Sequence, residues 1–131
     1  MARILVVDDD VDFQVIMRRM LESEGYEVEI AADGDQALEM VRGEEPPDLI
    51  LLDVMMATTL EGVDVAREIK GDLALEDIPI IMVSSIATSP YAADFPEDEV
   101  PIDGWLTKPV QRSVLLKMLD RFLGESEEEL E

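Results

Sequence analysis

The sequence predicts an α/β domain built on a parallel sheet that helices cover on both faces. Apolar runs of strand length alternate with stretches of helical period along the 131 residues, and this alternation is typical of a doubly wound fold. The runs are short and almost wholly apolar, as strands buried on both faces are. The length suits one domain with one substantial core.

The first half of the chain predicts three strands and two helices. We expect strands at residues 3–7, 27–31 and 49–52, the last running into Asp53. A helix at residues 12–24 should end at Gly25 in the C′ position, and a second helix should run from Gly34 to the breakers around Gly43. The side chains expected to face the sheet are Val15, Ile16, Met20 and Leu21 in the first helix and Ala37, Leu38 and Val41 in the second.

The second half continues the alternation, with one irregular stretch. We expect strands at residues 80–83, ending at Ser84, and 104–107, and helices at 62–70 and 111–123. Their inward side chains should be Val65, Ala66 and Ile69, then Val114, Leu115, Met118, Leu119 and Phe122. Residues 85–103 hold three prolines and several acids, which predicts a solvated loop with at most a short, atypical fourth helix. We divide the chain into a domain at 1–123 and a disordered acidic tail at 124–131.

Composition excludes several kinds of function. The chain has no Cys and no His, so disulfides, thiolate metal sites and imidazole catalysis are excluded. The formal net charge of −22 disfavours direct binding to nucleic acid or to anionic lipid. The apolar run after Met1 is too short for a signal peptide or a membrane span. We therefore expect a cytoplasmic protein.

Polar residues follow the predicted strands at the same end of each strand. Asp8, Asp9 and Asp10 follow the first, Asp53 ends the third, Ser84 ends the fourth and Lys108 follows the fifth. Ligands of open α/β sheets bind at the carboxyl ends of strands, where the strand order reverses. If the order is 2-1-3-4-5, Asp8, Asp9 and Asp53 meet at that point.

Three carboxylates packed together require a cation or raised pKa values. An oxygen-only ligand set favours a hard ion, Mg²⁺ or Mn²⁺, and two or three carboxylates suit Mg²⁺ better than a Ca²⁺ cage. Asp8, Asp10 and Asp12 imitate the start of an EF-hand loop. Phe13 and Arg19 stand where that loop needs Gly and Glu, so the imitation is accidental.

Such a site can support phosphoryl transfer to a carboxylate. A carboxylate can attack a phosphoryl group to give an acyl phosphate, and the transfer depends mainly on positioning and charge neutralisation. Lys108 is the candidate ammonium, and Ser84 offers a hydroxyl to a phosphoryl oxygen. Because the chain has no glycine-rich phosphate loop, we expect a carrier other than a nucleotide to deliver the phosphate.

Four segments at predicted strand ends resemble the receiver domain of bacterial two-component response regulators. They are residues 4–10 (ILVVDDD), 51–56 (LLDVMM), 79–85 (PIIMVSS) and 105–109 (WLTKP), and the likeness spans residues 3–123. The resemblance implies a flavodoxin-like, doubly wound five-stranded sheet in the order 2-1-3-4-5. It also implies a stand-alone signalling domain that catalyses only its own phosphorylation and dephosphorylation.

The resemblance assigns roles to individual residues. Asp53 would accept the phosphoryl group from the phosphohistidine of a sensor histidine kinase or phosphotransfer protein. Asp9 would bind Mg²⁺ directly, Asp8 through water, Asp53 directly, and Met55 through its backbone carbonyl. Ser84 resembles the switch hydroxyl, Lys108 the phosphate-binding lysine and Trp105 the switch aromatic. The downstream partner protein is unknown, and the domain would be a monomer or a phosphorylation-dependent dimer.

The chain departs from the usual sequence pattern of the family in two places. Ala57 stands where relatives usually have Pro, Gly62 comes late, and the proline-rich stretch replaces an ordinary fourth helix.

Two other functions are alternatives to a phosphoacceptor domain. One alternative is an aspartate phosphohydrolase of the haloacid dehalogenase type, although Asp12 stands where that motif needs Thr or Val. The other is an adaptor that binds partners without phosphorylation. A fragment of a longer regulator or hybrid kinase also fits.

Overall fold

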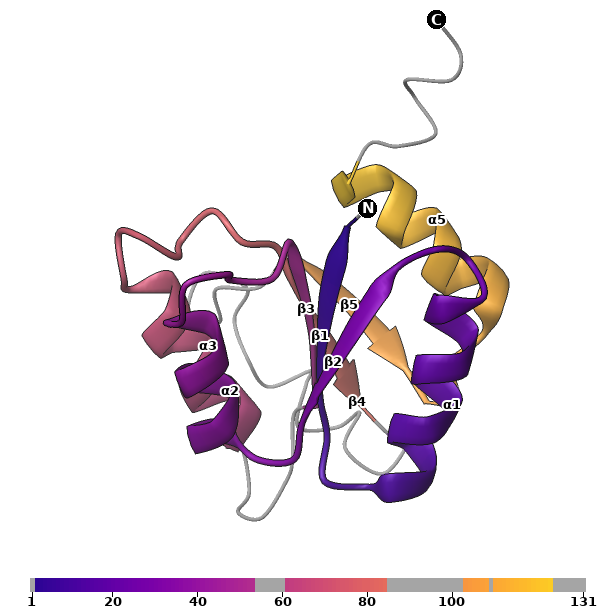
Figure 1. Ribbon diagram of the computed structural model, residues 1–131, viewed down its shortest axis with the longest axis horizontal. Helices are drawn as coiled ribbons and strands as arrows, with labels where there is room; N and C mark the ends of the chain where they lie inside the picture. The colour runs from indigo at the N-terminus through magenta and orange to yellow at the C-terminus, as the bar shows by residue number, and fades with distance from the viewer. Residues whose placement is uncertain (1, 54–60, 85–102, 109, 124–131) are drawn as a thin grey trace, which may run out of the picture.

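A five-stranded parallel sheet forms the centre of the computed structural model, which describes residues 2–53, 61–84, 103–108 and 110–123 (Figure 1). The strand order is β2-β1-β3-β4-β5, which confirms the predicted order. The strands are β1 (Arg3–Val7), β2 (Glu27–Ala31), β3 (Leu49–Asp53), β4 (Ile80–Ser84) and β5 (Gly104–Thr107). The helices are α1 (Val11–Glu22), α2 (Gly34–Val41), α3 (Glu61–Lys70) and α5 (Arg112–Leu123).

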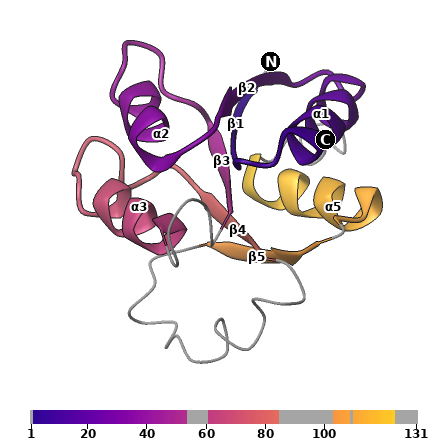
Figure 2. The same cartoon turned by 90° about the horizontal axis from the view of Figure 1, so that it is seen from below.

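The helices cover the two faces of the sheet in pairs. Helices α2 and α3 lie on one face, and α1 and α5 lie on the other (Figure 2). Alternate residues of each strand enter different cores because successive side chains point to opposite faces. Leu5, Val7 and Ile50 pack on the α2–α3 side, and Val6 and Leu51 pack on the α1–α5 side. The central strands β1 and β3 are thus covered on both faces.

The predicted inward faces are confirmed for α2 and α3 but only partly for α1 and α5. Val15 and Ile16 of α1 and Val114 of α5 are exposed, so their predicted burial is wrong. Met17 and Leu21, spaced by one turn, are the buried residues of α1. Helix α1 has apolar residues on most of its sides, and periodicity alone could not fix which side faces the sheet.

Local hydrogen bonds fix the ends of α1. Asp10 is the N-cap, and its side chain accepts from the amide of Asp12, so the helix begins at Val11, one residue before the predicted start. The helix ends at Glu22 with Ser23 as the C-cap, and Gly25 at φ +94° completes the turn. Gly25 is therefore the second residue after the C-cap, whereas the prediction made it the first, and its left-handed backbone favours glycine there.

Asp103 was expected in a solvated loop, but it forms defined contacts at the start of β5. Its carboxylate lies 2.9 Å from the ammonium of Lys70 and accepts from the amide of Ile80 at 2.8 Å. Residues 85–102 and 124–131, including the predicted atypical fourth helix and acidic tail, lie outside the described residues. Within the described part of the chain, no helix has the length and apolar character needed to cross a membrane.

Candidate metal and phosphoacceptor site

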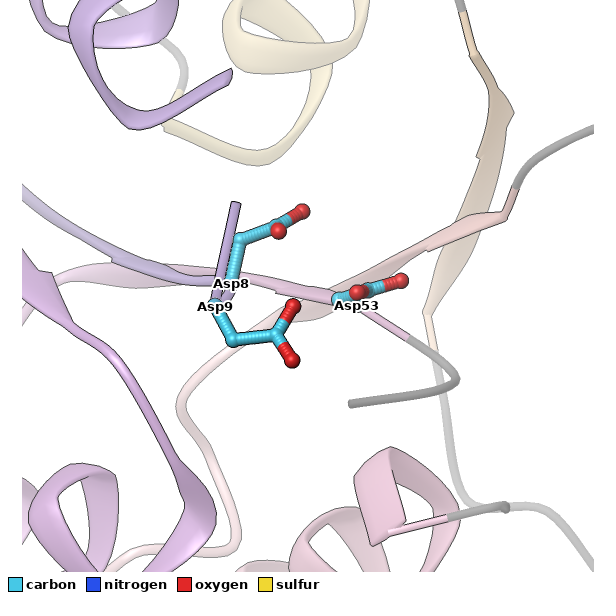
Figure 3. Close-up of side chains that lie close together, drawn as sticks. All are labelled: Asp8, Asp9 and Asp53. Atoms are coloured by element: carbon cyan, nitrogen blue, oxygen red, sulfur yellow. The ribbon is translucent and has the colours of Figure 1, made fainter. Parts of the chain in front are cut away.

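Three carboxylates gather at the carboxyl ends of β1 and β3, as the sequence predicted. Asp8 and Asp9 follow β1, and Asp53 is the last residue of β3. One oxygen from each carboxylate lies within 4.8 Å of the others. Figure 3 shows the three side chains together at the sheet edge, with the carboxylate of Asp9 turned toward Asp53. Asp8 is fully buried and Asp53 nearly so, whereas Asp9 is exposed.

The turn from β1 into α1 fixes the position of Asp8. The amide of Asp8 donates to the carbonyl of Ala31 at 3.0 Å, which extends the pairing with β2. Its Oδ1 accepts from the amide of Asp10 at 2.8 Å, and its carbonyl accepts from the Gln14 side chain at 2.6 Å. Since Asp10 also caps α1, the helix start and the buried carboxylate hold one another in place.

Lys108 brings a positive charge to this cluster from the end of β5. Its Nζ lies 2.8 Å from Oδ2 of Asp8 and 3.9 Å from Oδ2 of Asp53. The same ammonium lies 4.4 Å from the centre of the Phe13 ring. The side chain is 22% exposed, so the lysine reaches the carboxylates while solvent or a ligand can still contact it.

The cluster has the properties of a divalent cation site. Oδ2 of Asp8 is buried and, among the described residues, has no hydrogen bond of good geometry, although the lysine ammonium is close. Lys108 supplies one positive charge against three carboxylates, and closely packed carboxylates need further compensation. Oxygen ligands with one exposed member suit Mg²⁺, which retains several waters. The donor set therefore fits the ion that the sequence predicted.

The remaining predicted site residues are placed only in part. The backbone of Ser84 ends β4 in register with Thr107, but its side chain lies outside the described residues. Met55 also lies outside them. Trp105 of β5 is half-buried, is in register with Met82 and packs against the core on the α2–α3 side.

Phe13 and Gln14 contact the site and were not predicted from the sequence. Both lie in the first turns of α1, where Gln14 bonds the Asp8 carbonyl and Phe13 faces the Lys108 ammonium. Their signal was their position directly after an acidic cluster at a strand-to-helix turn. A single sequence does not show that the end of β5 places Lys108 beside the start of α1.

The family model of the response regulator receiver domain matches residues 4–120. The chain belongs to the response regulator receiver family. Response regulator MprA of Mycobacterium tuberculosis is 36% identical over 129 residues, which are 98% of this chain and 53% of that protein. The chain thus spans about half the length of the curated relatives it matches.

Two solved receiver domains share this fold and hold magnesium. The receiver domain of a Pseudomonas aeruginosa sensor histidine kinase, with a magnesium ion in its active site cleft, is 30% identical with a TM-score of 0.82, and the match covers 95% of this chain and 98% of that one. The response regulator TrrA of Thermotoga maritima, in complex with Mg²⁺ and BeF, is 30% identical with a TM-score of 0.79, and the match covers 93% and 99%. The receiver fold and its place in two-component phosphorelay signalling follow from these matches together with the family model.

Proposed function

We propose that this receiver domain is a phosphoacceptor switch in which Asp53 takes a phosphoryl group from a phosphohistidine. The observation that carries the proposal is the meeting of Asp53 with Asp8, Asp9 and the Lys108 ammonium at one sheet edge. A carboxylate oxygen of Asp53 attacks phosphorus, an O–P bond forms, and the N–P bond to the donor imidazole breaks. The product is an acyl phosphate on Asp53, and the imidazole is the leaving group.

Asp9, Asp53 and the Met55 carbonyl would hold Mg²⁺ directly in this site and Asp8 would hold it through water, and Mn²⁺ could substitute. The bound ion would neutralise charge on the phosphoryl oxygens during transfer. Lys108 already lies 3.9 Å from Asp53, so a small movement lets its ammonium contact a phosphoryl oxygen. The two similar receiver domains that hold magnesium support the choice of ion.

The phosphoryl group would alter the neighbouring strands and so change the affinity for a partner protein. It adds about −1.5 to −2 charge at neutral pH beside a nearly buried strand end. The Ser84 hydroxyl and Lys108 would close on it, and Trp105 would move. The surface around β5 and α5 would then bind the downstream protein differently. This is the behaviour of a segment with two conformations whose equilibrium is shifted by a local change in charge.

The exposed apolar residues of α1 offer a docking surface for the phosphodonor protein. Val11, Val15 and Ile16 are 66%, 45% and 55% exposed on the helix that begins directly after the acidic cluster. Exposed apolar side chains that cluster beside a site are typical of protein contacts. A sensor kinase or phosphotransfer protein that packs on α1 would bring its phosphohistidine to Asp53.

Beryllofluoride, a phosphoryl mimic, tests the switch through the fluorescence of Trp105. The chain has one Trp, so the signal reports a single side chain. We expect a saturable change that requires Mg²⁺ and is absent in Asp53→Ala. No change with Mg²⁺ present would contradict the coupling of Trp105 to the site. Turnover of a generic phosphate ester would favour a phosphohydrolase, and partner binding unaffected by Asp53→Ala would favour an adaptor.

A further inference from the structure

The Lys108 ammonium lies closer to one of the two carboxylates that it could bridge than to the other. It lies 2.8 Å from Asp8 but 3.9 Å from Asp53, and it sits 4.4 Å from the Phe13 ring centre. An ammonium over an aromatic face within about 6 Å is attracted by the ring quadrupole. The ammonium is therefore close to both Asp8 and the Phe13 ring, and Asp53 is its more distant partner.

We propose that Phe13 is a positioning residue that holds Lys108 to one side of the carboxylate cluster. This rests on the proposed function, because it concerns the same lysine and the same cation site. With the ammonium held against Asp8 and the ring, it competes less with a divalent cation for the carboxylates of Asp9 and Asp53. Without the ring, the ammonium is freer to bridge Asp8 and Asp53 and to compete with that cation.

The local structure fixes the ring relative to the carboxylate. Asp10 accepts from the amide of Phe13 at 3.4 Å at the start of α1, and Gln14 donates to the Asp8 carbonyl at 2.6 Å. Phe13 also packs against the core on the α1–α5 side. The turn that positions Asp8 thus positions the Phe13 ring as well. When a cation neutralises the carboxylates, this uncharged ring remains as a partner for the Lys108 ammonium.

The test compares Phe13→Leu, which keeps apolar volume but removes the ring, with Phe13→Tyr, which keeps the ring. Mg²⁺ affinity is measured by calorimetry on the full chain. We expect Phe13→Leu to weaken Mg²⁺ binding about three- to tenfold, the range that a cation–π contact supports. Phe13→Tyr should bind like the unmodified chain, and thermal melts establish that both variants fold.

Lys108→Met completes a double-mutant cycle. Removing the ammonium should tighten Mg²⁺ binding, and Phe13→Leu should then have no further effect on it. If Phe13→Leu weakens binding equally with and without Lys108, the ring acts through packing alone and the proposal is overturned. The same holds if Phe13→Leu binds Mg²⁺ like the unmodified chain.

A second readout does not depend on metal. The sequence has three lysines, Lys70, Lys108 and Lys117, so the side-chain NMR signals of Lys108 can be assigned with Lys108→Met. The Lys108 methylene protons next to Nζ should show an upfield ring-current shift that Phe13→Leu abolishes and Phe13→Tyr retains. An unshifted signal in the unmodified chain would overturn the placement. Neither readout involves phosphoryl transfer, so a failure of Asp53 to accept phosphate would be seen separately.

Discussion

At the residue scale, the cluster at the sheet edge combines buried and exposed acids with unequal roles. Asp8 is fully buried and lies 2.8 Å from Lys108, whereas Asp9 is exposed and turned toward Asp53 (Figure 3). Like charges held together in this way repel in the absence of a cation and bind one when it is present. Without a cation, the repulsion among these carboxylates therefore lowers the free energy of unfolding slightly.

Asp9→Asn is predicted to stabilise the cation-free protein and to weaken cation binding. Removing one charge relieves repulsion, so the midpoint of thermal unfolding in EDTA should rise by roughly 2–4 °C. The further rise caused by Mg²⁺ should shrink because a ligand is lost. Differential scanning fluorimetry with and without Mg²⁺ measures both.

Asp35→Asn is the matched control, since it removes an exposed acid in the first turn of α2 that is not one of the three clustered carboxylates. It should leave the Mg²⁺-dependent rise unchanged. An Asp9→Asn protein that Mg²⁺ stabilises as much as the unmodified chain would remove Asp9 from the ligand set.

At the element scale, a lysine at the end of α3 links the amino ends of β4 and β5. Nζ of Lys70 donates to the carbonyls of Glu76 and Ile78 at 2.9 and 2.8 Å and lies 2.9 Å from Asp103. The lysine side chain is 16% exposed, so these contacts are only partly screened by solvent. They join elements at the edge of the sheet opposite the carboxylate cluster.

Lys70→Met should lower the free energy of unfolding by about 1–3 kcal/mol, because it leaves half-buried acceptors without their donor. Urea denaturation measures the change. Lys117→Met, at an exposed position of α5, serves as the control and should cost under about 0.5 kcal/mol. Equal stability of the two variants would show that the Lys70 contacts contribute nothing.

The proposed docking surface on α1 gives the second prediction at this scale. Val15→Asp or Ile16→Asp adds a charge to an exposed apolar surface without creating a cavity. Transfer from a phosphorylated donor protein should slow about tenfold or more, as for truncation of central contacts in an interface. Phosphorylation by acetyl phosphate should be unchanged, since it needs no protein contact.

Leu73→Asp provides the matched control for α1. Leu73 is 86% exposed and follows α3, where it has no part in the proposed surface. The control should transfer at the unmodified rate. Equal slowing at Leu73 and Val15 would indicate a general charge effect, and no slowing at either α1 position would remove α1 as the donor surface.

At the scale of the whole molecule, the sequence predicted the sheet better than the helix faces. Residues 4–7 and 49–52 are wholly apolar and buried, so β1 and β3 could be located from these runs in the sequence. The meeting of Asp8, Asp9 and Asp53 followed from one topological rule, that the carboxyl ends of parallel strands share an edge. Val15 and Ile16 were misplaced because α1 is apolar on several sides.

Contacts that join distant segments were beyond a single sequence. Phe13 and Lys108 are far apart in the chain, and only the packing of α1 beside the end of β5 brings them together. The pairing of Lys70 with Asp103 depends likewise on the order of β4 and β5. Periodicity describes one element at a time, so it cannot predict side chains that meet between elements.

The most direct test of the central claim is intact-mass spectrometry of the chain after incubation with acetyl phosphate and Mg²⁺, followed by peptide mapping. We expect a single added phosphoryl group on Asp53 that forms only with the divalent ion and is absent in Asp53→Asn. Asp35→Asn should be modified like the unmodified chain. A chain that gains no phosphoryl group, or gains it equally in Asp53→Asn, would contradict the assignment of Asp53 as the phosphoacceptor.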